Sequence, residues 1–357
     1  TLGETRKSLE HLELAALIFE ELGQQVSQAT LLNNLGLINR AMGNQDDAIE
    51  QYNTALSIFR ASKHRAGEAD VTLNLSAVYS DQFRNVEAME YFNRALEMFR
   101  EAGNRQREAV ILNNIGVFYN KLGDRENSLD YYNQSAAIAE NIGDRRQFAS
   151  ALKKIGILYL NTNETDKAFE YLTRALDISR AINDRLNEAW VLSNIGLIYD
   201  KRGDYEKARQ YMLQALEIFR TVGSREGEAR TLFNLGLTSH HTSEYKNASE
   251  YYAQALRFSR ELQTPGEEAK VLLHIARLVR DFGGAEESRG NIEQAIGIIE
   301  SLRAAIPGQE LRSSFFSLGK DSYELYIDLL MQENSGKPPP ENIAKALETS
   351  ERTRARS

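Results

Sequence analysis

The chain has 357 residues, of which 42% are hydrophobic and 26% charged, and it carries a net charge of −8. An acidic chain lacks the basic face that non-specific nucleic-acid binding requires. No apolar run reaches the roughly 20 residues of a membrane span, and the absence of cysteine excludes disulfides and cysteine-based sites from these residues. We therefore expect a cytoplasmic location, no cofactor, and no nucleic-acid or membrane partner.

Residues 1–25 carry the first copy of a spacing that returns along the chain. Small, apolar, small and aromatic side chains follow one another at Ser8, Leu12, Ala15 and Phe19. The same spacing recurs forty residues later, inside the second helix of a predicted helix pair. We therefore expect residues 1–25 to be the second helix of a truncated repeat. Since the chain begins with Thr1 and has no signal peptide, we expect it to be part of a longer protein with further repeats before it.

Residues 26–303 repeat one pattern of two amphipathic helices joined by a tight turn. The first helix has a small residue every forty positions, where a partner helix can approach closely: Gly36, Ser76, Gly116, Gly156, Gly196, Gly236 and Ala276. The second helix has a small residue with the same period: Ala48, Ala88, Ser128, Ala168, Ala208, Ala248 and Ser288. The period never slips, which predicts seven helix pairs that bury their apolar faces against their neighbours.

The residues within one copy resemble those of the tetratricopeptide repeat. In the copy at 187–222, Leu192, Ile195, Gly196 and Tyr199 lie on the first helix, and Ala208, Met212 and Ala215 lie on the second. The usual unit is about 34 residues, so a forty-residue unit is similar to the long-repeat type of kinesin light chains and LGN/Pins scaffolds. The resemblance implies an all-α fold, a right-handed superhelix (α-solenoid) of stacked antiparallel helix pairs. We expect the extra residues at the junction before each first helix, as at Gly143-Asp144-Arg145.

Residues 304–357 depart from the repeat and predict a helical C-terminal cap or linker. Pro307 and the run Pro338–Pro340 mark loops. The segments between and after them predict helices at Gln309–Gln332 and Glu341–Arg356.

This C-terminal segment is similar to the one that leads into CHAT domains, the caspase-like modules that follow bacterial tetratricopeptide arrays. The matching residues are Arg312, Phe315, Tyr326, Leu329, Leu330, Ala346, Leu347, Glu348, Glu351, Arg352, Arg354, Ala355 and Arg356. The resemblance implies that the repeats regulate or target a downstream CHAT domain. That family's catalytic His and Cys have no counterparts here, so we assign no catalytic residue and expect no enzyme activity from these residues.

Asparagine precedes the Leu-Gly pair in five of the seven copies. This Asn series comprises Asn34, Asn74, Asn114, Asn194 and Asn234. Asparagine gains nothing in a helix interior by propensity. In tetratricopeptide arrays this position lines the concave groove, where an amide can donate to and accept from the backbone of an extended peptide. In the other interpretation, each Asn bonds a neighbouring helix and fixes the stacking of the repeats.

Arginine recurs at the start of five first helices. This Arg series comprises Arg65, Arg105, Arg145, Arg185 and Arg225, and all but Arg145 have a glutamate three residues later. One interpretation is an i,i+3 ion pair worth a few tenths of a kcal/mol when exposed. The other is a basic stripe at the groove rim that receives acidic groups. LGN-type arrays resemble this arrangement and bind acidic segments of their partners.

Two further features have open interpretations. Trp190, the single tryptophan, either anchors a ligand side chain in the groove or packs between repeats. His240 and His241 are adjacent on a helix, so they point about 100° apart and make a poor metal site; we interpret them as a partly exposed surface pair.

These features predict a protein-interaction scaffold whose groove binds an extended, acidic peptide or partner segment. The alternative is a regulatory module that self-associates, with the groove occupied by its own chain or by a second copy.

Overall fold

The structure is a computed structural model that describes residues 12, 14–282, 284–305, 316–332 and 338–354. The motif residues Ser8, Arg312, Phe315, Ala355 and Arg356 lie outside these ranges, as does the first part of the helix predicted to begin at residue 309. Within the described ranges every regular element is an α-helix and none is a strand.

The chain forms two compact units, Thr1–Thr162 and Asn163–Ser357. In the first unit, residues 14–21 are helical and are followed by α2 (Gln25–Ala41), α3 (Gln45–Ala61), α4 (Arg65–Asp81), α5 (Asn85–Glu101), α6 (Arg105–Lys121), α7 (Arg125–Asn141) and α8 (Arg145–Asn161). The second unit contains α9 (Thr165–Ala181), α10 (Arg185–Lys201), α11 (Tyr205–Val222), α12 (Arg225–His241), α13 (Tyr245–Glu261), α14 (Pro265–Asp281), α15 (Ala285–Ala305), α16 (Phe316–Gln332) and α17 (Pro340–Arg354).

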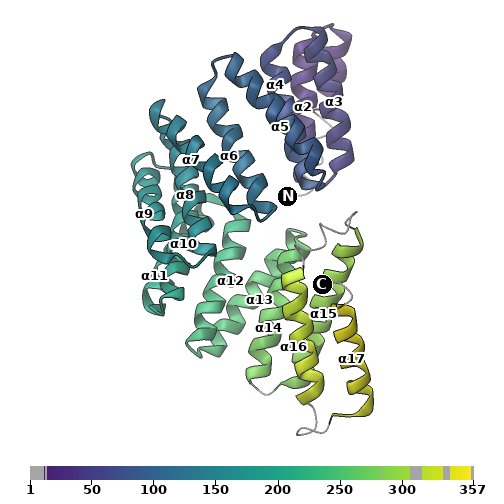
Figure 1. Ribbon diagram of the computed structural model, residues 1–357, viewed down its shortest axis with the longest axis vertical. Helices are drawn as coiled ribbons and strands as arrows, with labels where there is room; N and C mark the ends of the chain where they lie inside the picture. Colours follow the sequence, from purple (N-terminus) through teal and green to yellow (C-terminus); the bar gives the residue numbers. More distant parts are fainter. Residues whose placement is uncertain (1–11, 13, 283, 306–315, 333–337, 355–357) are drawn as a thin grey trace. The chain divides into compact units, whose positions relative to one another are not determined.

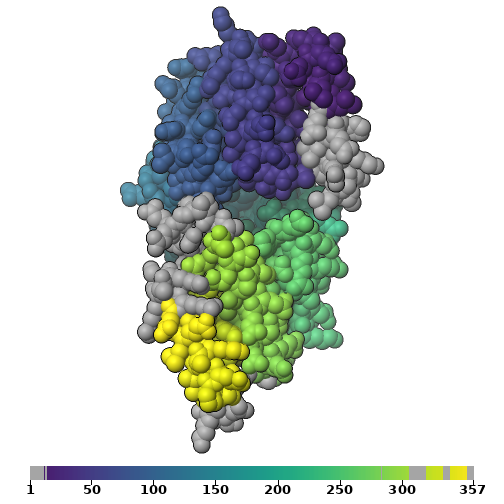
Figure 2. Space-filling model, turned by 90° about the vertical axis from the view of Figure 1, so that its right-hand side faces the viewer, coloured from purple at the N-terminus to yellow at the C-terminus, as the bar shows by residue number. Residues whose placement is uncertain are grey.

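Consecutive helices pack as antiparallel pairs in each unit (Figure 1). The pairs in the first unit are α2 with α3, α4 with α5 and α6 with α7; those in the second are α10 with α11, α12 with α13, α14 with α15 and α16 with α17. On the face that Figure 2 shows, side chains of neighbouring helices within each unit lie against one another. The predicted all-α solenoid of stacked helix pairs is therefore confirmed. None of the described helices is both long and apolar enough to cross a membrane.

The turns explain the forty-residue period, and they correct the expected place of the extra residues. From α2 to α10, helices of 17 residues alternate with turns of three, both within a pair and between pairs. The middle residue of nearly every such turn is left-handed, as at Gly43, Lys63, Phe83, Gly103 and Gly123, twenty residues apart. Such a residue lets the backbone cap the preceding helix. The junction before a first helix is therefore no longer than the turn inside a pair, and the prediction of a longer junction was wrong.

The small positions of the first helices lie against the second helix of the same pair. A Cβ added to Gly116 would lie 2.6 Å from the ring of Tyr132 and 3.2 Å from the carbonyl oxygen of Ser128. At Gly196 the corresponding neighbour is the carbonyl oxygen of Ala208, at 3.1 Å. The predicted close approach of the two helices at these positions is therefore confirmed.

Candidate functional site

The first helices of neighbouring pairs form a row in each unit. In the first unit α2, α4, α6 and α8 contact one another in order, and in the second unit α10, α12, α14 and α16 do so. The second helices of neighbouring pairs show no comparable contact among the described residues. Each unit is therefore locally concave on the side of its first helices. We call these two sets the first-helix rows.

The Asn series divides between the two predicted roles in the first unit. Asn34 is exposed. Asn74 is half-buried, and its Nδ2 donates to Oδ1 of Asn33 on the neighbouring first helix, at 2.7 Å. Asn114 is half-buried and lines a shallow pocket of about 130 Å³ together with Lys121. Asn74 therefore links two repeats, whereas Asn34 and Asn114 reach the surface.

The Asn series is buried in the second unit. Nδ2 of Asn194 donates to the carbonyl oxygen of Trp190, one turn earlier on α10, at 2.6 Å. Asn234 is 5% exposed, and its Nδ2 has no hydrogen-bond partner among the described residues. A buried donor without a partner is costly. The Nδ2 of Asn234 therefore remains free to donate a hydrogen bond from just beneath the surface of α12.

Three members of the Arg series make the i,i+3 ion pair. Arg65 lies 3.5 Å from Glu68, Arg185 lies 2.5 Å from Glu188, and Arg105 pairs with its glutamate in the same way. Arg145 makes no ion pair within the described ranges. The guanidinium of Arg225 lies over the ring of Phe258, 5.2 Å from its centre.

The paired glutamates also receive a second arginine, which the sequence reasoning missed. Nε of Arg60, Arg100 and Arg180 lies 2.9 Å from Glu68, Glu108 and Glu188, which are all buried. The second arginine comes from the end of the preceding helix, eight residues earlier and across a turn. A signal was present in the sequence, because the copy with Phe148 in place of glutamate also has Glu140 in place of this arginine. Each buried carboxylate thus links its own first helix to the last helix of the preceding repeat.

A cationic and aromatic cluster lies on the first-helix row of the second unit. Trp190 on α10 packs edge-on against Phe219 at 4.8 Å, and the guanidinium of Arg230 on α12 lies over its ring at 5.7 Å. Nζ of Lys270 on α14 lies 4.7 Å from the centre of the Phe233 ring. Neither Arg230 nor Lys270 makes an ion pair with a carboxylate within the described residues. Burial lowers the pKa of Lys270, and the nearby Arg230 lowers it further against the opposing effect of Glu267.

These residues occupy one position of the repeat. Trp190, Arg230 and Lys270 each precede by four residues the position of the Asn series, which is occupied by Asn194, Asn234 and His274. Residues at i and i+4 share one helix face, so three neighbouring helices present this pair side by side. Burial keeps His274 neutral by lowering its pKa to about 3.

His240 is half-buried and His241 is exposed, as expected for a partly exposed pair, and their side chains also link three first helices. Nε2 of His240 lies 2.9 Å from Asp281 on α14, and Nδ1 of His241 lies 3.2 Å from Asp200 on α10. The hydrogen bond with Asp200 raises the pKa of His241 above its usual value. No group of three or more potential metal ligands occurs in the part of the chain that the structure describes.

The contact between His241 and Asp200 predicts a pH-dependent stability. A histidine with a raised folded pKa stabilises the fold fully below the unfolded pKa of about 6.5, and this contribution is lost as the pH rises through the folded pKa. His274 acts with the opposite sign, since its folded pKa is depressed. We therefore expect the melting temperature of wild type minus that of His241→Lys to fall between about pH 6 and pH 8, because lysine keeps its charge and His274 is common to both proteins. Thermal melts across this range test the prediction, and a constant difference would contradict it.

The row of paired helices defines a class of repeat proteins, the α-solenoids. A sequence profile of the tetratricopeptide repeat matches residues 1–61, 27–101, 67–141, 107–181, 147–221 and 187–261. The chain therefore belongs to the tetratricopeptide repeat family. A search of curated proteins gives no match.

Solved structures share this fold at low sequence identity. A Rap protein complexed with competence and sporulation factor is 16% identical, covers 100% of this chain and 98% of its own, and has a TM-score of 0.63. A signal transduction ATPase with numerous domains and a tetratricopeptide repeat sensor, from Pyrococcus horikoshii, is 14% identical over 99% of this chain and 53% of its own, with a TM-score of 0.60. A putative kinesin light chain from Podospora anserina is 13% identical over 56% of this chain and 98% of its own, with a TM-score of 0.45.

Proposed function

We propose that the chain is a protein-interaction module whose first-helix row in the second unit binds an extended, acidic peptide segment. The observation that carries the proposal is the pair of cations, Arg230 and Lys270, which lie on adjacent helices without a carboxylate partner among the described residues. Lys270 is buried enough for its pKa to be lowered. The unpaired charge of Lys270 is costly in this partly buried position until an anion neutralises it. A glutamate or aspartate of the ligand would supply that anion.

The surroundings of the two cations suit an extended peptide. Asn234 lies one turn after Arg230 on α12 and has an unsatisfied Nδ2 that a small rotation of its side chain would offer to a peptide carbonyl. Trp190 gives the same surface an aromatic edge. Among proteins of this fold, the Rap structure was determined in complex with competence and sporulation factor, which is consistent with a binding role for a solenoid of this kind.

The role we propose for the Arg series is secondary. Arg65, Arg105 and Arg185 already have carboxylate partners within the chain, so an acidic ligand would compete with those ion pairs. Arg225 has no such partner and lies at the first residue of α12, on the helix that also carries Arg230. We propose Arg225 as the member of the series that most readily meets the ligand.

Peptide binding can be tested with a labelled decapeptide of alternating Glu and Ala, and with its Gln-containing counterpart. Fluorescence anisotropy is expected to show saturable binding of the acidic peptide, and about tenfold weaker binding to the Asn194→Ala, Asn234→Ala double variant if two hydrogen bonds are lost. Asn234 has no Nδ2 partner to lose, and Asn194 loses only its side-chain bond to the Trp190 carbonyl within α10. The double variant should therefore keep the far-UV circular dichroism of the wild type. An unchanged affinity in the double variant would contradict the assignment of the Asn series to the site.

We also propose that these repeats regulate or target a CHAT domain. The support is the sequence pattern of α16 and α17, in which Leu330 and Ala346 are buried and Leu329 packs into the core cluster of α14 and α15. The proposal requires a His and a Cys in a caspase-like context beyond Ser357, and a continuation without them would contradict it. If the first-helix row is instead occupied by a second copy of the chain, light scattering will show a mass that rises with concentration, and the acidic peptide will lower it.

A further inference from the structure

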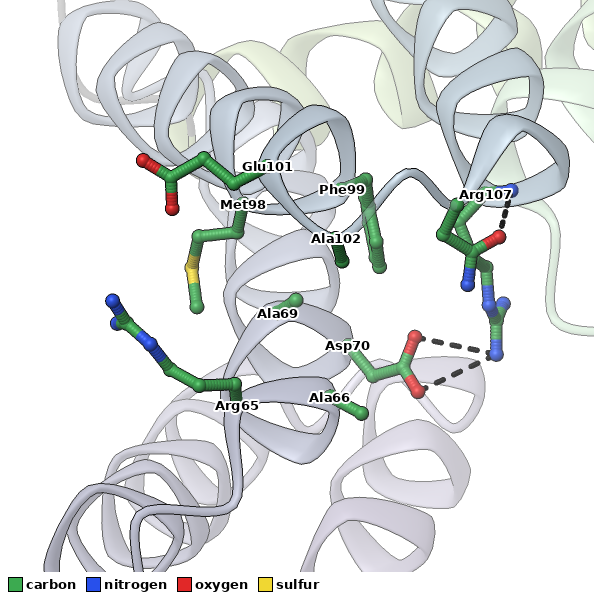
Figure 3. Close-up of a pocket in the computed structure, with 10 residues that line it drawn as sticks. Arg65, Ala66, Ala69, Asp70, Met98, Phe99, Glu101, Ala102 and Arg107 are labelled. Carbon is green, nitrogen blue, oxygen red and sulfur yellow. Dashed lines mark hydrogen bonds and ion pairs between the residues drawn. The ribbon is translucent and has the colours of Figure 1, made fainter.

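Lys270 on α14 is a half-buried lysine whose amine contacts an aromatic ring instead of a carboxylate. Its Nζ lies 4.7 Å from the centre of the Phe233 ring, and it makes no ion pair within the described residues. Asp70, at the same position of the repeat in the first unit, shows the contrast, because its carboxylate lies 3.2 Å from Arg107 of the next first helix (Figure 3). The charge of Asp70 is therefore neutralised within the chain, whereas that of Lys270 is not.

The surroundings of Lys270 favour the uncharged form of its amine. Burial lowers the pKa of Lys270, because the ammonium ion loses hydration; Glu267 on the same helix opposes this effect, and the guanidinium of Arg230 on α12 adds to it. His274, one turn later on α14, adds no charge, since burial lowers its own pKa to about 3. The uncharged amine is the nucleophilic form of lysine, so this site raises the reactivity of Lys270 at neutral pH.

A small opening lies between α12, α13 and α14 beside this amine. Its volume is about 130 Å³, which leaves room for a short chain of a few carbon atoms, and Phe233 borders both the opening and Nζ of Lys270. Val271 extends the apolar wall, and Arg230 lines the opening together with Glu226 and Glu267. Because charges of both signs stand at its edge, the opening suits a group that is short and uncharged.

We propose that Lys270 is a site of acylation by short-chain acyl thioesters. Nζ attacks the carbonyl carbon of the thioester, and the carbon–sulfur bond breaks as the amide bond forms. The proton that the nitrogen gives up passes to the departing sulfur, so the amide and a free thiol are the only products. The acyl chain lies in the opening, against Phe233 and Val271.

Acylation removes the positive charge of Lys270 and thereby regulates the surface around Arg230. This consequence rests on the proposed function of that surface. The acylated chain, and Lys270→Gln as its mimic, are expected to bind the Glu-containing decapeptide about tenfold more weakly, because one of the two cations is lost.

Acylation itself is measured in the absence of any peptide. The full chain is incubated with S-acetyl-N-acetylcysteamine, and the acetylation of each lysine is followed by mass spectrometry after digestion. The reference is Lys246, which is exposed on α13. At pH 7 Lys270 is expected to react at least about threefold faster than Lys246, and its rate should level off at a lower pH, below the usual lysine pKa of about 10.4. The difference should vanish in urea.

Two exposed neighbours test the electrostatic cause with opposite signs. Arg230→Gln is expected to slow the acetylation of Lys270 at pH 7, and Glu267→Gln is expected to accelerate it, whereas both leave Lys246 unchanged. A Lys270 that reacts no faster than Lys246, or a change of the same sign in both variants, would overturn the proposal. Rapid acetylation of Lys270 in a chain that binds no acidic peptide would contradict only the proposed function.

Discussion

The Phe219→Ala variant is expected to lose about 3–5 kcal/mol of unfolding free energy, the usual cost of truncating a buried phenylalanine. Phe219 is fully buried on α11, and its ring packs against Trp190 on the preceding first helix. Gly227 on α12 has no side chain in this place because a Cβ there would lie 2.1 Å from the ring of Phe219. The aromatic ring therefore packs between two neighbouring repeats, and Gly227 has no side chain with which to fill the space that it leaves.

Urea denaturation followed by Trp190 fluorescence and by circular dichroism measures this loss. Leu213→Ala on the same helix is the control, because Leu213 is exposed and should change stability by less than about 0.5 kcal/mol. A Phe219→Ala protein as stable as this control would contradict the structural account of the junction.

The chain itself suggests a compensating change at this junction. One repeat before α12, the positions of Phe219 and Gly227 are occupied by Ser179 and Asn187, which are joined by a hydrogen bond of 2.8 Å. We expect Phe219→Ser, Gly227→Asn to be more stable than Phe219→Ser by about 1 kcal/mol, the net worth of a typical hydrogen bond. A double variant less stable than Phe219→Ser would contradict the expectation that serine and asparagine at these two positions form a stabilising hydrogen bond.

Reversing the two unpaired cations, with Arg230→Glu and Lys270→Glu, is expected to reduce the affinity for an acidic peptide at least tenfold. Hydrogen bonds to charged groups contribute about 1.5–3 kcal/mol each, and the new carboxylates repel the ligand. The variant should keep its fold, since neither cation has a carboxylate partner within the described residues. Anisotropy titration with the Glu-containing decapeptide measures the loss.

The matched control changes the net charge equally on α13, the second helix of the α12 pair. Lys246 and Arg257 are exposed there, and the exposed ion pair of Arg257 with Glu261 at 3.7 Å contributes little to stability. The effect of Lys246→Glu with Arg257→Glu on peptide binding should therefore come from the long-range attraction, which salt screens. An equal loss of affinity in both double variants would show that net charge, not the position of Arg230 and Lys270, attracts the peptide.

The repeat and its helix pairs could be predicted from the sequence because their causes are local. The small residue at Gly196 and the apolar residues around it recur with one period, and both helices of a pair follow from that pattern. The ion pair between Arg185 and Glu188 could also be predicted, since it lies within one turn of a helix.

The remaining contacts join residues that only the turn geometry brings together. Arg180 reaches Glu188 across a turn, and Arg230 reaches Trp190 from the next first helix, forty residues away. The burial of Asn194 and Asn234 likewise depends on the packing of neighbouring helices. Asn34 has the same place in the repeat but is exposed, so the position in the repeat could not predict burial. Spacing predicted which residues share a position, but not how deeply each copy buries it.

The most direct test of peptide binding in the second unit uses Trp190, because it is the single tryptophan of the chain and lies beside Arg230. Its fluorescence is recorded while the Glu-containing decapeptide is added, and again with the Gln-containing decapeptide. We expect a saturable change with the acidic peptide, a much weaker response to its neutral counterpart, and no response in the Arg230→Glu, Lys270→Glu variant. Identical curves for the two peptides, or no change with either, would contradict the proposed site.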